Sequence, residues 1–327
     1  MGEKSEQMYL GDLVSADGKH DKNILSRKNK SIGTIDQIMD ILNSTYFGKY
    51  FFEVALVLRS SLLLSSILLN SEAWVNLTHS NIRSLEQIDE KLLSRILDSE
   101  ANSSNAMKYI ELGLHPIRFE LMKRKILFLQ YILKQEKSSM MYQVLKATQE
   151  NPIKNDFVKT CEEYLSILDI KLSFEEIEGM SQWSFKKLVK VKTEAAGLKY
   201  LQCQINKQTK ASNIEYFDLK IQEYFVGGHC NKKLSKLIFK ARSQSLDIKT
   251  QQKWKYADST CIGCKIQVET GEEILFCEIL NNENRLADIP VKYDWFYRNA
   301  VCDIVTVGKL LDKGMKQRHK ILEDGIT

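Results

Sequence analysis

The chain has 327 residues, of which 43% are hydrophobic and 27% are charged, and this balance predicts a globular protein of two or three domains. Only three prolines over this length argue against a loop-rich all-β fold and favour long helices. The formal charge of +5 is uneven, because residues 181–260 hold 16 Lys and Arg against six Asp and Glu. Such a basic segment is typical of a protein that binds a polyanion, although a solvated lysine-rich helix surface gives the same pattern.

The first predicted element is a β-hairpin. Residues 8–23 read MYLGDLVSADGKHDKN, in which short apolar runs flank Gly11 and Asp12, and ADG at 16–18 is typical of a hairpin turn. A lone two-stranded hairpin is only marginally stable in water. We therefore expect it either to fold back on the following helices or to belong to a larger sheet outside this chain.

Helical periodicity dominates the chain from the hairpin to about residue 250. Apolar residues recur at helical spacing between Ile32 and Leu42, and Gly48 interrupts that pattern. Pro116 is well placed to open a later helix, because proline fits the first turn of a helix. Further helical segments are expected at residues 51–69, from a cap at Ser80 or Asn81 to residue 97, at 106–113, 115–135, 157–168, 174–179, 183–204, 213–226 and 230–246, and in the tail from about 293.

Residues 51–69 form an apolar run that is as long as a membrane span. The run contains Glu53, Arg59 and four serines, and two charges within one span are expensive in a bilayer. We therefore expect a helix that is buried on most sides in a soluble protein, with no membrane partner.

The cysteine content indicates a reducing compartment. The first residues, MGEKSEQ, are polar and lack the apolar core of a signal peptide, which argues against secretion. An odd number of cysteines fits free thiols better than a disulfide framework, so we expect an intracellular protein. The seven cysteines are Cys161, Cys203, Cys230, Cys261, Cys264, Cys277 and Cys302.

Cys261-x-x-Cys264 followed by Cys277 is the strongest local motif. Two thiolates separated by two residues can bind one tetrahedral Zn²⁺, and a second pair of ligands is then expected nearby. Cys277 supplies one member of that pair, and Glu273 stands four residues before it, where the fourth ligand belongs. The alternation around these cysteines predicts a small Cys-rich β element. The pattern is compatible with a zinc site, a decayed zinc site or three unrelated buried thiols.

Basic residues follow aromatic residues in two later segments. Lysines neutralise phosphates and exposed aromatic rings stack on unpaired bases, so both segments are candidates for nucleic-acid binding. The alternative is that the rings belong to the core and that the lysines cover the solvent side, and for the rings we favour this reading. The residues are Trp183 and Phe185 before Lys186, Lys187, Lys190 and Lys192, and Tyr224 and Phe225 before Lys232, Lys233, Lys236 and Lys240.

Sequence signatures of hydrolases and of nucleotide-binding loops are absent, and the five histidines are scattered. A standalone enzyme would therefore need an active site that is assembled only in three dimensions, with ionisable groups converging on one pocket. We keep that reading as an alternative.

Several stretches occur in a distinctive order along nearly the whole chain. They are MYLGDLVSADGKHDKNI, RKNKSIGTIDQIMDIL, FGKYFFEVALVLRSSLLLSSIL, LEQIDEKLLSRIL, YIELGLHPIRFELMKRKILFLQYIL, FKKLVKVK and the CxxC…C region with its basic tail. In this order they resemble the end of the palm and the thumb of reverse transcriptases from non-LTR, LINE-like retrotransposons. We therefore expect a mainly α fold with an N-terminal β-hairpin, a helical thumb-like bundle, a further helical domain and the Cys-rich element.

The resemblance also implies roles for individual residues. In that family the YLG hairpin holds the primer end, so the implied primer-grip residues are Tyr9, Leu10 and Gly11. The helices after it clasp the template–primer duplex, and the implied backbone contacts come from Arg27, Lys28, Lys30 and Lys49. The cysteines resemble a zinc knuckle whose usual ligands are Cys, Cys, His and Cys. The implied zinc ligands are therefore Cys261, Cys264, Glu273 and Cys277.

The fingers and the catalytic palm of this family lie upstream of the primer grip, and the seven residues before Met8 cannot encode them. We therefore expect a truncated fragment that binds RNA or an RNA–DNA duplex and does not polymerise alone. Mg²⁺ would belong only to an intact polymerase, and nuclear residence is implied by the family. The alternatives are a partner that completes a catalytic polymerase half in trans and a vestigial reading frame without a selected function.

Four regions are expected along the chain. Residues 1–24 form the primer-grip-like hairpin, and 25–110 form the thumb-like helical domain. Residues 111–250 form a helical C-terminal domain, and 251–327 contain the Cys-rich region and a basic helical tail.

Overall fold

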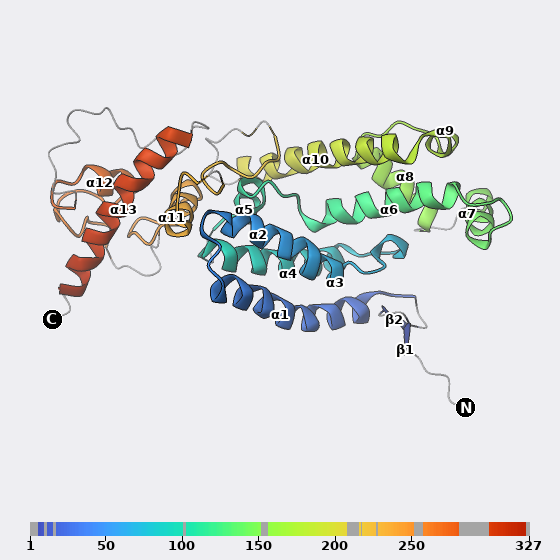
Figure 1. Ribbon diagram of the computed structural model, residues 1–327, viewed down its shortest axis with the longest axis horizontal. Helices are drawn as coiled ribbons and strands as arrows, with labels where there is room; N and C mark the ends of the chain where they lie inside the picture. The colour runs from blue at the N-terminus through green and yellow to red at the C-terminus, as the bar shows by residue number, and fades with distance from the viewer. Residues whose placement is uncertain are drawn as a thin grey trace.

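A computed structural model describes residues 6–9, 12–15, 18–100, 103–151, 156–207, 216, 218–226, 228–251, 258–280 and 301–324. The described part is mainly helical, as the sequence predicts, with α7 and α9 toward one end of an elongated molecule and α12 and α13 toward the other (Figure 1). The elements up to α5 are β1 Glu6–Tyr9, β2 Asp12–Ser15, α1 Asp21–Ser44, η1 Gly48–Tyr50, α2 Phe51–Leu58, η2 Arg59–Leu64, α3 Ser65–Ile67, η3 Ser71–Ala73, α4 His79–Leu97 and α5 Asn105–Glu111. The later elements are α6 Ile117–Leu133, α7 Met140–Glu150, α8 Phe157–Ile167, α9 Phe174–Gly179, α10 Gln182–Asn206, α11 Lys232–Arg242, α12 Gly271–Phe276 and α13 Val301–Asp324.

The N-terminal hairpin is present, and it folds back on the helices. β1 and β2 pair antiparallel, with Glu6 opposite Ser15 and Tyr9 opposite Asp12. The chain therefore reverses between Tyr9 and Asp12, and the turn signal at 16–18 lies beyond the hairpin. Of the two outcomes expected from the sequence, docking on the helices is the one observed.

Asp12 is the residue through which the hairpin docks. Its carboxylate accepts hydrogen bonds from Asn23 Nδ2 and Asn70 Nδ2, both at 2.8 Å, and pairs with the Arg27 guanidinium. Partial burial alone raises the pKa of Asp12, but the hydrogen bonds from Asn70, Asn23 and Arg27 more than offset it, so the pKa is lowered. The carboxylate thus stays ionised between α1 and the end of the apolar run.

The apolar run folds as α2, the π-helical segment η2 and α3. Arg59, at the start of η2, is buried, and its Nε and Nη2 atoms each lie 2.6 Å from a carboxylate oxygen of Asp89 on α4. Burial alone lowers the pKa of Arg59, and the charge of Asp89 more than offsets this effect. Among the described residues, Gly48–Ile67 is the one helical stretch long and apolar enough to cross a membrane. The absence of a membrane partner stays a prediction.

Two hydrophobic cores lie along the molecule, and α6 and α10 contribute to both. The larger core joins α1–α5 to α11–α13, and it includes Ile117 of α6 and Leu201 of α10. The smaller core packs α7–α9 against Ile126 of α6 and Phe185 of α10. The long helices α6 and α10 therefore pack in the smaller core at one end and in the larger core at the other, which connects the two cores.

Glu111, the last residue of α5, binds the later part of the chain to the first helices. Its carboxylate accepts hydrogen bonds from Tyr224 Oη at 2.8 Å, from Arg242 Nε at 2.7 Å and from Tyr216 Oη, and all four residues are buried. Its backbone carbonyl accepts from the Gln222 N–H at 3.0 Å. Burial, followed by the charge of Glu111, raises the pKa of both tyrosines, so the phenols remain protonated donors.

Two sequence predictions differ from the structure. The helix predicted at 213–226 is wrong for residues 218–226, which form turns and an isolated bridge between Ile221 and Leu112. The Cys-rich β element is not confirmed, because described residues 258–280 hold one isolated bridge, Thr260 with Val268, and the short helix α12. The division into four regions stays a prediction.

Replacing Glu111 with Gln should strongly destabilise the protein. The variant removes the Glu111 charge that pairs with the buried Arg242 guanidinium, and breaking a buried ion pair costs about 3–5 kcal/mol. Urea unfolding followed by circular dichroism measures the change in the free energy of unfolding. A loss below about 1 kcal/mol would contradict the role assigned to this carboxylate.

Asp218→Asn is the matched control, because it breaks an exposed ion pair whose Asp218 Oδ2–Lys220 Nζ distance is 2.5 Å. Exposed pairs contribute about 0–1 kcal/mol. The double variant Glu111→Leu with Arg242→Met removes both charges and should recover part of the lost stability.

Candidate functional site

An open groove of about 710 Å³ lies where the loop before α2 meets the segment before α11. Tyr46 and Lys49 line it from the first segment, and Lys232 and Lys233 line it from the second. The two segments touch, since a Cβ atom on Gly228 would lie 3.5 Å from Lys49 Cδ. We call this surface the basic groove, because lysines that are far apart in the sequence meet on it.

The lysines of α11 crowd one another around a buried ring. Lys232 Nζ lies 3.8 Å from the centroid of the Phe51 ring, and Lys236 Nζ lies 5.8 Å from it. Burial, followed by the charges of Lys232 and Lys240, lowers the pKa of Lys236 to about 8, against an opposing effect of Asp98. Lys240 Nζ is 3.0 Å from Asp98 Oδ2, so the carboxylate that opposes the shift of the Lys236 pKa is already engaged.

Two helix starts face the groove. Gly48 has a φ of +54°, a left-handed conformation that glycine adopts without strain, and it turns the chain into η1 and α2. Asn231 caps α11 by accepting a hydrogen bond from the Leu234 N–H at 2.9 Å. The first residues of both helices, Phe51 and Lys232, line the groove. The N-terminal ends of these helices therefore add partial positive charge to that of the lysines.

The hairpin and α1 residues implied by the reverse-transcriptase resemblance lie elsewhere. Tyr9 is the last residue of β1, whereas Leu10 and Gly11 lie outside the described residues. Lys28 and Lys30 are exposed on α1 and do not line the basic groove. Of the residues implied as thumb contacts, only Lys49 lines the basic groove.

Arg27 lies in the interior. Only 6% of the residue is exposed, its Nη1 donates to the Ser66 carbonyl at 2.7 Å, and its guanidinium lies 4.9 Å from the centroid of a Trp74 ring. Together with the ion pair to Asp12, these contacts make Arg27 a structural residue. We therefore leave it out of any nucleic-acid surface.

A second basic surface lies near the start of α10, beside α9 and toward the opposite end of the molecule from α11 (Figure 1). Trp183 is 71% exposed, and Lys187 Nζ lies 5.2 Å from the centroid of its ring. Lys192 pairs with Asp169, Nζ to Oδ2, at 2.8 Å. The exposed lysines here are Lys186, Lys187 and Lys190.

Most of the aromatic residues beside the lysines belong to the core. Phe185, Tyr224 and Phe225 are buried, as expected, and Trp183 is the exception. Phe225 packs against Phe52 of α2, with ring centroids 4.5 Å apart. The segment before α11 is thus held by aromatic packing. Of the α11 lysines, Lys233 is exposed, whereas Lys232, Lys236 and Lys240 are half-buried.

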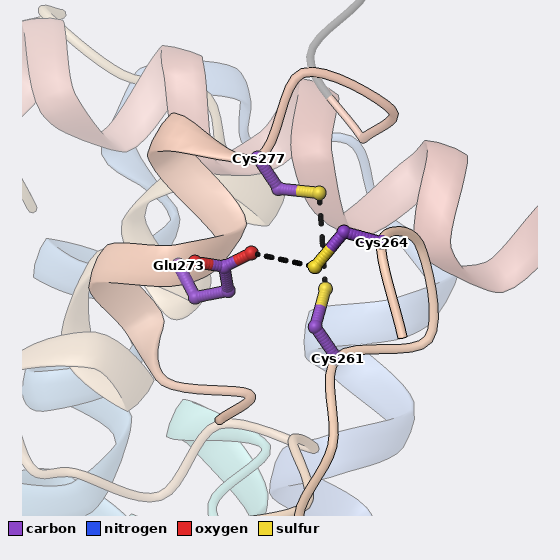
Figure 2. Close-up of side chains that lie close together, drawn as sticks. All are labelled: Cys261, Cys264, Glu273 and Cys277. Atoms are coloured by element: carbon purple, nitrogen blue, oxygen red, sulfur yellow. Dashed lines mark hydrogen bonds between the residues drawn. The ribbon is translucent and has the colours of Figure 1, made fainter. Parts of the chain in front are cut away.

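The four predicted metal ligands come together in one cluster (Figure 2). The Sγ atoms of Cys261 and Cys277 are 3.8 Å apart, Cys264 Sγ lies 3.2 Å from Glu273 Oε1, and all four ligand atoms lie within 4.8 Å of one another. In a tetrahedral site with Zn–S bonds of about 2.3 Å, two thiolates are about 3.8 Å apart. The arrangement thus fits a tetrahedral ion. Burial raises the pKa of Cys261 to about 12, although the Gly263 and Cys264 N–H groups lower it.

Local backbone geometry brings the thiols together. Lys265 has a φ of +57° and its N–H donates to the Cys261 carbonyl at 2.9 Å, which closes a tight turn after the second cysteine. Gly263 permits close packing, because a Cβ atom there would lie 2.9 Å from Leu280 Cγ and 3.1 Å from Cys277 Sγ. Glu273 is presented from the first turn of α12, which Thr270 caps.

Glu269 and Arg318 connect this cluster to α13. Glu269 is buried, and its carboxylate accepts from Arg318 Nε at 3.0 Å, from the Ile262 N–H at 3.2 Å and from the Lys249 N–H at 2.9 Å. One carboxylate thus holds the turn between Cys261 and Cys264 against α13 and the segment after α11. An ion in the cluster would stabilise the part of the molecule that carries the lysines of α11.

A second cavity, of about 470 Å³, is lined by four charged groups that pair with one another, and by His79 and Tyr109. Arg118 makes two hydrogen bonds to Glu86, at 2.6 and 2.9 Å, and Arg83 Nη1 lies 2.5 Å from Glu90 Oε1. Burial raises the pKa of Glu90. Since each charge in this set has a protein partner, the cavity gives no support to the standalone-enzyme reading.

Sequence reasoning missed the basic groove as a single site. The family resemblance points to Lys49 and the local charge to the α11 lysines, and no sequence pattern points to Tyr46. One signal was present: α11 begins with Lys232 and Lys233 and has no acidic residue in its first turn. Because lysines at a helix N-terminus oppose the helix dipole, such a start is typical of an anion-binding surface.

Comparisons with protein families, with curated proteins and with solved structures found no match. The resemblance to reverse transcriptases accordingly stays a prediction, and any function has to be argued from the basic groove and the cysteine cluster.

Proposed function

We propose that this protein binds nucleic acid through the basic groove. The observation that carries the proposal is the convergence of Lys49, Lys232 and Lys233 on one open surface that two helix N-termini face. Lys236 adds to this charge from the next turn of α11, and the carboxylate of Asp98 is paired with Lys240. A phosphate backbone would relieve the repulsion among these lysines.

We also infer that the cysteine cluster binds Zn²⁺ as a structural ion. Three thiols and one carboxylate at tetrahedral spacing are the support for this inference. The ion would fix the turn at Cys261–Cys264 against α12 and leave no open position for catalysis. With all four positions taken by protein ligands, its contribution would be to folding.

The reverse-transcriptase ancestry, the completion of a polymerase in trans and nuclear residence stay predictions. The docking of the hairpin through Asp12 uses the helices of this chain, so it lends no support to pairing with another chain's sheet. A binding module that needs no catalytic palm is the reading that the basic groove favours.

Neutralising Lys49, Lys232 and Lys233 with Gln should weaken binding of a labelled RNA hairpin and flatten its salt dependence. Each lost phosphate contact lowers the slope of log K against log salt by about 0.7–0.9, so the triple variant should lose about 2. Fluorescence anisotropy at several salt concentrations measures both quantities.

The matched control neutralises Lys186, Lys187 and Lys190 on α10, which removes the same charge from the other basic surface. It should leave the slope nearly unchanged. An equal loss in both triple variants, or a loss in the α10 variant alone, would contradict binding at the groove.

Binding should weaken as the pH is raised from 7 to about 10, where ordinary lysines begin to lose their charge. Lys236, with its pKa of about 8, is charged below that pH, and a bound polyanion stabilises the charged form. Affinity is therefore highest below pH 8 and should fall by about threefold to tenfold above it. Lys236→Arg keeps the charge at all these pH values and should flatten the profile, whereas an unchanged profile would count against Lys236.

Zn²⁺ binding at the cluster should have a stoichiometry of one, measured by competition with a chromophoric chelator, and Co²⁺ should give thiolate charge-transfer bands. Cys264→Ser should weaken binding by about 100-fold, because one ligand supplies about a quarter of the affinity. Glu273→His should retain or tighten it.

Cys203→Ser is the control for the metal experiment, since this thiol is exposed on α10 and outside the cluster. If Cys264→Ser bound zinc as tightly as the original protein, the cluster would be a decayed site or a set of unrelated thiols.

A further inference from the structure

We propose that the ligand of the basic groove is a single-stranded nucleic acid and that Tyr46 stacks on one of its unpaired bases. This inference rests on the proposed function and adds the class of nucleic acid. It departs from the duplex-clasping role that the reverse-transcriptase resemblance implies.

Tyr46 presents an uncovered aromatic ring on the wall of the groove. The residue is 95% exposed and lines the groove beside Lys49. Its Cε1 atom lies 3.5 Å from where a Cβ atom of Gly48 would be, so the ring sits over a position that has no side chain. The face of an exposed tyrosine ring is free for stacking, and a nucleobase is a flat partner that can stack on it.

Two other aromatic residues near the lysines, Phe51 and Tyr50, already have partners. Phe51 is buried under Lys232, and the Tyr50 ring has Lys49 Nζ at 5.1 Å from its centroid. Among the described residues, no ring or cation lies over Tyr46. Phe47, which packs partly against the larger core, and His229 also line the groove, whereas Tyr46 is 95% exposed.

The arrangement suits an unpaired strand better than a duplex. In a duplex the bases stack on one another and expose only their edges, so an aromatic wall gains nothing from them. In a single strand each base can turn onto a ring while the adjacent phosphates remain on the lysines. The groove, at about 710 Å³, has room for more than a lone phosphate.

The test compares fluorescence anisotropy for four labelled ligands of about ten nucleotides, a length within common single-strand site sizes. They are single-stranded RNA, single-stranded DNA, an abasic strand with the same phosphates and a blunt duplex. Tyr46→Ala should lower affinity for the two base-containing strands by about 5- to 150-fold, the range of one stacked base. It should leave the abasic strand and the duplex unchanged, and Tyr46→Phe should retain full affinity.

Tyr131→Ala is the matched control, because Tyr131 is 51% exposed on α6 and does not line the groove. The stacking proposal is overturned if Tyr46→Ala has no effect, or if it weakens all four ligands equally. A loss of affinity of Tyr46→Ala for single-stranded RNA or DNA supports the stacking proposal, and the strand with the larger loss is the preferred ligand. The lysine triple variant reports separately on the groove: if it loses no affinity, the proposed function fails whatever Tyr46 does.

Discussion

The carboxylate of Glu111 is the interaction on which the later part of the structure depends. It accepts hydrogen bonds from Tyr224 and Arg242 in the interior, where no water can replace them. Arg242 is the last residue of α11, and Tyr224 lies in the segment before α11. The end of this helix and the segment that leads into it are therefore both bound to α5. The ion pair between Glu111 and Arg242, together with the packing of Phe225 on Phe52, fixes α11 against the first helices and so places its lysines near Lys49.

Much of the fold could be predicted from the sequence because it is local. Apolar periodicity places α1, α4 and α10, and Pro116 marks the start of α6 as its fixed φ requires. The cysteine cluster was also predictable, since Cys261 and Cys264 are joined by one turn and Glu273 and Cys277 by one helical turn. Spacing alone then determines which side chains meet.

The sequence predictions that failed concern residues whose conformation depends on contacts with distant parts of the chain. Residues 218–226 have apolar spacing that suits a helix, but Ile221 instead bridges to Leu112 and Gln222 bonds to the Glu111 carbonyl. In the sequence, Arg27 resembles a surface cation in a basic stretch. Its burial follows from contacts with Asp12 and Trp74, which only the structure reveals. The groove joins two segments that no periodicity connects, so their meeting had no signature in either segment alone.

The crowding of lysines on α11 means that folding and the binding proposed for the basic groove would shift the pKa of Lys236 in opposite directions. The pKa of Lys236 falls to about 8 on folding, so this lysine destabilises the folded state at neutral pH. The penalty disappears as the pH rises from about 8 toward the pKa that lysine has in the unfolded chain. A bound anion removes the same penalty. If the basic groove binds an anion as proposed, a substitution that stabilises the free fold by removing a lysine charge from α11 would also weaken binding.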